Sequence, residues 1–134
     1  MHMEMKIGDS LSNSREVTAE LIEKFADVSG DYNPIHLDEE FASKTRFGKR
    51  IAHGMLSGAF ISAILGNEYA GSTVIYLSQT LKFTAPVFIG DMVTTTSTVT
   101  NIREDKNIVT LENICTNQNG ETLVQGESKI MILN

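Results

Sequence analysis

Residues 53–69, HGMLSGAFISAILGNEY, carry an apolar or small side chain at nearly every position. A helix made from this segment has no polar stripe to turn toward water, and a helix that is apolar all round is a buried one. We therefore expect residues 53–69 to form a central helix. Other elements of the fold must cover it on most sides.

Four segments rich in Val, Ile and Thr follow this helix. Such β-branched residues, with several alternating stretches, are typical of strands. The segments are STVIYLSQTLKF (72–83), DMVTTTSTVTNIRE (91–104), KNIVTLENICTNQ (106–118) and ETLVQGESKIMIL (121–133). The sequences between them read as turns, and Asn119-Gly120 is the strongest hairpin signal among them.

Strands joined by hairpins form an antiparallel meander, and a short first strand is expected around Met5–Ile7. Only a sheet that curls around the apolar helix covers it on most sides. The predicted fold class is α+β. It is a single domain over residues 1–134, in which a curved antiparallel sheet of about five strands wraps around one long central helix.

Composition excludes several classes of protein. The chain has 134 residues, of which 41% are hydrophobic and 21% charged, as in ordinary globular domains. A net charge of −6 argues against nucleic acid as a partner, and no run approaches the ~20 apolar residues of a membrane span. The lone Cys115 excludes an internal disulfide, and the start MHMEMKIGDSL does not resemble a secretory signal. We expect a cytoplasmic protein.

An amphipathic helix is predicted before the central one, over Thr18–Ser29. Leu21, Phe25 and Val28 form its apolar stripe, with Thr18 as N-cap, and Gly30 ends it. Pro34 prevents the helix from continuing, so Asp31–Leu37 is expected to be a fixed loop. Asp38 then caps a short helical stretch over residues 39–42, and KTRFGKR (44–50) is again a loop.

Asp31 and His36 are the candidate catalytic residues. A loop fixed by proline can bring an aspartate and a histidine to one point, which acid–base chemistry on a single water requires. Asp-x-Asn-Pro is also good turn chemistry, so on pattern alone Asp31 is equally well a turn residue and His36 a loop histidine.

Gly54 opens the central helix, where its amide can stabilise negative charge developing on a carbonyl oxygen. Close helix packing is the alternative reason for a glycine there. Ser57, one turn later, either faces the same cleft or bonds back to the backbone, and a capping or structural role suffices for His53. Lys49 and Arg50 form a small basic spot that either meets a ligand phosphate or is solvated surface.

Other chemistries find little support in the sequence. The single Cys115 lies far from the histidines, and HGMLSG lacks the Gly-x-Ser-x-Gly elbow of hydrolases. No phosphate-binding glycine loop, dinucleotide fingerprint or His-x-x-x-His pair occurs. We expect no metal and no prosthetic group.

Residues 29–56, SGDYNPIHLDEEFASKTRFGKRIAHGML, closely resemble the signature of the MaoC-like (R)-specific enoyl-CoA hydratases. In that signature an Asp-x-Asn-Pro-x-His motif is followed by Phe-Gly and then by Ala-His-Gly-Met. A weaker resemblance covers LKFTAPVFIGDMVT (81–94). The resemblance to this family implies a hot-dog fold, usually paired into a dimer whose sheets join edge to edge. It also implies hydration of trans-2-enoyl-CoA to (R)-3-hydroxyacyl-CoA.

The resemblance also implies roles for the matching residues. Asp31 and His36 would be the catalytic pair, the Gly54 amide the oxyanion donor, Asn33 a support for the loop, and Ser57 a neighbour of the site. Three alternatives share the acyl-thioester architecture: a 3-hydroxyacyl-[acyl-carrier-protein] dehydratase, a hot-dog acyl-CoA thioesterase and a noncatalytic acyl-thioester binding module. An aspartate and a histidine on one short loop favour hydration.

Overall fold

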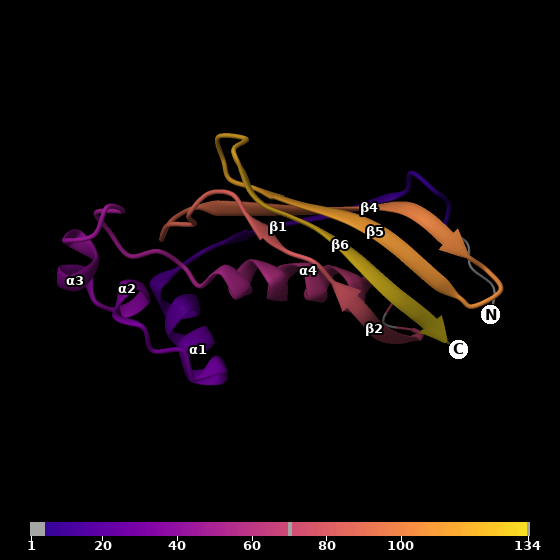
Figure 1. Ribbon diagram of the computed structural model, residues 1–134, viewed down its shortest axis with the longest axis horizontal. Helices are drawn as coiled ribbons and strands as arrows, with labels where there is room; N and C mark the ends of the chain where they lie inside the picture. Colours follow the sequence, from indigo (N-terminus) through magenta and orange to yellow (C-terminus); the bar gives the residue numbers. More distant parts are fainter. Residues whose placement is uncertain (1–4, 70, 134) are drawn as a thin grey trace.

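The computed structural model describes residues 5–69 and 71–133, and its centre is one antiparallel sheet in the order β1-β4-β5-β6-β2, with β3 paired to β6. The strands are β1 (Ser10–Glu16), β2 (Thr73–Gln79), β3 (Lys82–Phe83), β4 (Met92–Arg103), β5 (Ile108–Thr116) and β6 (Thr122–Leu133). The sheet curls along the central helix α4 (Gly54–Glu68) (Figure 1). The predicted fold class is confirmed.

α4 packs one face against the sheet. Leu56, Phe60, Ile61, Ile64 and Leu65 are buried on that face. They meet strand side chains that alternate inward, such as Val99, Leu111 and Ile130. The described part of the chain leaves much of the opposite face open, and Met55 on it is 57% exposed. The prediction of burial on most sides was therefore wrong for the single chain, because one sheet can cover only one side of a helix.

The first strand is not where the sequence predicted it. Residues 5–7 are outside the sheet, and β1 begins at Ser10. β1 is mostly polar and exposed, and it pairs antiparallel with β4; side-chain hydroxyl contacts, such as Ser10 Oγ to Thr98 Oγ1 at 2.9 Å, accompany this pairing. A strand at the edge of a sheet whose side chains face water has no alternation of apolar and polar residues. The sequence therefore did not predict β1.

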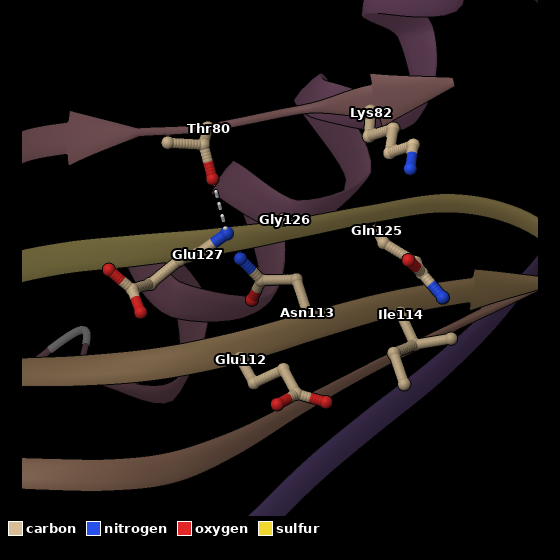
Figure 2. A pocket seen from close by; sticks show the side chains of 8 residues that line it. All are labelled: Thr80, Lys82, Glu112, Asn113, Ile114, Gln125, Gly126 and Glu127. Atoms are coloured by element: carbon tan, nitrogen blue, oxygen red, sulfur yellow. Dashed lines mark hydrogen bonds between the residues drawn. The ribbon is translucent and has the colours of Figure 1, made fainter. Parts of the chain in front are cut away.

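The predicted strand over residues 72–83 is divided into β2 and β3. The register against β6 shifts between Tyr76 and Ser78, and the chain then continues beside β6 through Thr80 into β3. There the Thr80 amide donates to the Glu127 carbonyl, and the Glu127 amide donates to Thr80 Oγ1, both at 2.9 Å (Figure 2). Gly126 lies in β6 next to Thr80, where a Cβ would collide with the Thr80 carbonyl oxygen.

Three further helices gather at one end of the sheet, beside the start of α4 (Figure 1). They are α1 (Ala19–Ser29), α2 (Pro34–Leu37) and α3 (Glu39–Ser43). Thr18 caps α1 and Gly30 ends it with a φ of 78°, as predicted. Among the described residues, no helix is long and apolar enough to cross a lipid bilayer.

Candidate active site

The carboxylate of Asp31 uses its two oxygens for different purposes. Oδ1 accepts a hydrogen bond from the Asn33 amide at 3.1 Å, which forms a turn. Oδ2 lies 4.0 Å from His36 Nε2, and about half of the Asp31 side chain is exposed. The turn role and the catalytic role, which the sequence offered as alternatives, are therefore compatible in one side chain.

Asn33 starts a helical turn that the sequence analysis did not predict. Its Oδ1 accepts from the Ile35 amide at 3.1 Å, and Pro34 occupies the first position of α2. Proline ends a preceding helix but suits the first turn of a new one, because that turn needs no amide donor. The expected loop over Asp31–Leu37 is thus partly helical, and α2 fixes the orientation of His36.

His36 is buried, and its tautomer follows from its contact with the chain. Nδ1 lies 2.8 Å from the carbonyl oxygen of Ile51, which can only accept, so Nδ1 carries the proton. In the neutral ring Nε2 then has its lone pair free toward Asp31. Burial lowers the pKa of His36 from its ordinary value of 6.5, while the bond to Ile51 opposes this. The burial of the ring therefore favours the neutral form of His36.

Gly54 and Ser57 line a pocket of about 280 Å³ at the start of α4. Its walls are mainly apolar and include Ile51, Phe83 and Val124. The amide groups in the first turn of a helix have no partner within that helix, so the Gly54 amide is available to a ligand. Asp31 and His36 are not among the residues that line this pocket. Ile51 connects the two parts, because its carbonyl oxygen binds the His36 ring.

The structure separates the two basic residues that were predicted to contact a phosphate. Lys49 is exposed, with Nζ 4.5 Å from the centroid of the Phe88 ring. Arg50 is only 8% exposed, and its Nε donates to the His36 carbonyl oxygen at 2.7 Å. A buried guanidinium engaged with the main chain does not support the predicted phosphate contact for Arg50.

His53 is closer to the candidate pair than the sequence indicated. It makes no side-chain capping bond to α4, contrary to one predicted role. Its ring stacks on the His36 ring with centroids 3.9 Å apart and planes 25° apart. Nothing in the sequence pattern linked His53 to Asp31, whose carbonyl oxygen lies 3.0 Å from His53 Nε2.

The side chains of Asp31, His36 and His53 place possible metal ligands within 4.8 Å of one another. Nδ1 of His36 and Nε2 of His53 both face carbonyl oxygens and therefore carry protons. The remaining lone pairs lie in the planes of two rings that are stacked only 25° from parallel, so one ion cannot lie close to both planes at bonding distance. This geometry is poor for a shared metal ion.

A larger depression of about 420 Å³ lies on the face of the sheet away from α4 (Figure 2). Its lining includes Lys82, Glu112 and Glu127. None of the predicted site residues lies there. The predicted residues Asp31, His36, Gly54 and Ser57 lie at the other location, where α2 meets the start of α4.

Comparisons with known proteins agree on one family. The model of the MaoC-like domain matches residues 4–119. Over 129 residues the chain is 45% identical to an (R)-specific enoyl-CoA hydratase of Rhodospirillum rubrum, covering 96% of this chain and 89% of that protein. It is 36% identical over 133 residues to a mitochondrial 3-hydroxyacyl-[acyl-carrier-protein] dehydratase of Arabidopsis thaliana, covering 97% and 79%. The solved (R)-hydratase of A. caviae superposes with a TM-score of 0.92 at 40% identity, covering 97% and 98%.

Proposed function

The chain belongs to the MaoC-like domain family, and on that premise we propose that it is an (R)-specific enoyl-CoA hydratase. It adds water to trans-2-enoyl-CoA to give (R)-3-hydroxyacyl-CoA, and it catalyses the reverse dehydration. The observation that carries this proposal is the 4.0 Å separation between Asp31 Oδ2 and His36 Nε2. Curated (R)-specific hydratases at 45% and 41% identity support it.

We assign Asp31 and His36 as the catalytic pair. Two acceptors 4.0 Å apart are too distant for a direct hydrogen bond, but one water can reach both. The pair takes a proton from that water as its oxygen bonds to C3 of the enoyl thioester, and returns a proton to C2 from the same side. Addition is therefore syn. The transfers belong to the pair as a unit.

We assign the Gly54 amide as the donor that stabilises the enolate oxygen while C3 is attacked. The positive end of α4 adds to this stabilisation, since negative charge is favoured at a helix N-terminus. Ser57 lines the same pocket and is assigned a supporting contact there. Asn33 supports the pair by holding Asp31 Oδ1 in its turn.

The first experiment measures the loss of enoyl-thioester ultraviolet absorbance when purified protein meets crotonyl-CoA. Fast loss with formation of the (R)-3-hydroxy product is the expected result. Absence of hydration with crotonyl-CoA, longer enoyl-CoAs and an acyl-carrier-protein thioester would reject the proposal. Release of free thiol in place of hydration would instead identify a thioesterase, and binding without turnover would identify a noncatalytic module.

The rate of hydration is expected to depend on pH through His36. Burial is the main cause that lowers the pKa of His36 below 6.5; the Ile51 bond raises it, His53 lowers it and Asp31 raises it. Because the reaction needs the neutral ring, kcat/KM should be constant near neutral pH and fall about tenfold per pH unit below that lowered pKa. A pH profile of initial rates tests this, and an acid limb above pH 6.5 would contradict it.

A 3-hydroxyacyl-[acyl-carrier-protein] dehydratase is the second candidate, because relatives so named are 36% and 32% identical to this chain. The chemistry is the same, and only the carrier of the acyl group differs. Comparison of kcat/KM for CoA and acyl-carrier-protein thioesters of equal chain length distinguishes the two.

We retain Lys49 as the residue that contacts a phosphate of the substrate's carrier. The variant Lys49→Gln should therefore raise KM several-fold and leave kcat unchanged.

We propose that the protein is a homodimer joined along β2. In the described part of the chain β2 pairs only with β6, and its free edge exposes Ile75 and Leu77 by 40% and 45%. Unpaired edges of this kind need to be covered. Sedimentation should give twice the chain mass of 14.7 kDa, and Leu77→Lys should shift it toward the monomer. A wild-type monomer at micromolar concentration would contradict the proposal.

The compartment is proposed on chemical grounds alone. Cys115 is buried and free, as is usual where thiols stay reduced. We propose a cytoplasmic location, and fractionation of cells that produce the native chain tests it.

A further inference from the structure

The segment Arg50–His53 holds the main chain on which both proposed catalytic residues lie. His53 Nε2 donates to the Asp31 carbonyl oxygen at 3.0 Å, and Arg50 Nε donates to the His36 carbonyl oxygen at 2.7 Å. Between them, the Ile51 carbonyl accepts from the His36 ring at 2.8 Å. Each member of the pair is thus fixed by a different side chain from one four-residue segment.

The His53 side chain also packs against two other rings. Its ring lies between two others, with the centroid 3.9 Å from that of His36 and 5.0 Å from that of Phe25. His53 is only 3% exposed, so packing leaves this ring little freedom to move. His36 therefore has a flat, fixed surface behind it, and its Nε2 is held at a defined position relative to Asp31.

Stability alone is a poor explanation for these two side chains. His53 Nδ1 and one terminal nitrogen of Arg50, Nη2, are buried without a hydrogen-bond partner among the described residues. An unpartnered buried polar atom costs about 1–3 kcal/mol, and an apolar side chain of similar size would avoid that cost. Two such atoms next to the Asp31–His36 loop indicate that these side chains have a role other than stability. That role lies in the hydrogen bonds that His53 Nε2 and Arg50 Nε donate.

We infer that His53 and Arg50 are positioning residues, which set the distance and orientation of the Asp31–His36 pair through its main chain. The inference rests on the proposed hydratase function. A displacement of about 1 Å in a reacting group can cost about 100-fold in rate, so small losses of position are measurable. Neither residue needs to contact the substrate.

Two matched pairs of variants separate the hydrogen bond from the packing. In His53→Gln the side-chain amide can still donate from near the position of Nε2, whereas His53→Phe keeps the stacked ring and removes the donor. In Arg50→Gln the amide nitrogen replaces Nε, and Arg50→Met keeps the volume without a donor. The Phe and Met variants should lower kcat about 10–100-fold with KM changed less than about 3-fold. The Gln variants should recover a large part of kcat.

Val99→Ala serves as the control for a loss of stability. Val99 is buried at 2% exposure in β4 and belongs to the common hydrophobic core. This variant should lower the melting temperature and leave kcat intact. The inference is overturned if His53→Phe and Arg50→Met keep wild-type kcat, or if Arg50→Gln loses as much activity as Arg50→Met.

A second measurement does not depend on turnover. Nitrogen-15 NMR of the His36 ring should report a protonated Nδ1 in the wild type, and His53→Phe should shift the Nδ1 signal. An unchanged His36 spectrum in that variant would also overturn the inference. If the wild-type protein hydrates no enoyl thioester while the His36 signal still moves, the proposed function fails and the positioning role stands.

Discussion

Asp31→Asn and His36→Asn should each lower kcat for crotonyl-CoA hydration by about 10²–10⁴-fold. Asn at position 31 can still accept from the Asn33 amide with its side-chain oxygen, but it has no carboxylate to share a proton with water. Asn at position 36 can still donate to the Ile51 carbonyl, but it has no atom in place of Nε2. Both variants therefore remove the chemistry and keep the local hydrogen bonds.

The matched control for this prediction is Asp38→Asn. Asp38 belongs to the same segment and accepts from the Phe41 amide at 3.1 Å as the N-cap of α3. An Asn at this position can cap equally well, so kcat should stay within about twofold of wild type. Initial rates, with circular dichroism of each variant, provide the measurement. Retention of wild-type kcat by either variant of the pair would remove that residue from catalysis.

Gly126→Ala is expected to destabilise the protein by about 2–4 kcal/mol. Its Cβ would overlap the Thr80 carbonyl oxygen, which belongs to the backbone and cannot rotate away. Thr80 is itself tied to Glu127 by hydrogen bonds in both directions, so its backbone cannot move away from β6 without breaking them (Figure 2). Urea denaturation at equilibrium measures the free energy of unfolding.

Gly66→Ala is the matched control for this second prediction. Gly66 lies within α4, and nothing is within 4 Å of the position that a Cβ would take. Replacing glycine by alanine in a helix stabilises it by about 0.5–1 kcal/mol. The two variants should thus shift the denaturation midpoint in opposite directions. Equal shifts would show that crowding between residue 126 and the Thr80 carbonyl is not the cause.

Much of the secondary structure was predictable because it depends on residues that are close together in the sequence. Thr18 and Asp38 cap their helices through bonds that span three residues, and Gly30 adopts the left-handed conformation that ends α1. The central helix was predicted from its run of apolar residues, and the last three long strands from their β-branched residues and alternation. Each of these features depends on chemistry contained in one short window of sequence.

The features that were missed depend on residues far apart in the sequence. β1 is a strand only because it pairs with β4, and its hydroxyl contacts join residues up to 88 positions apart. The role of His53 depends on Asp31, 22 residues earlier. Arg50 was read as a surface charge, since no local pattern shows that a guanidinium turns inward toward the His36 carbonyl. Such partners become visible only after the chain has folded.

The strand order has a consequence for the chain while it is being synthesised. α4 leaves the ribosome before every strand of its sheet except β1, and β1 must wait for β4. β2 depends on β6, which follows β4 and β5 in the chain, so β2 is translated well before its partner. The most apolar segment of the nascent polypeptide therefore remains without its cover until the strands that follow it have been translated. That interval is when chaperones would be needed most, since exposed apolar surface promotes aggregation.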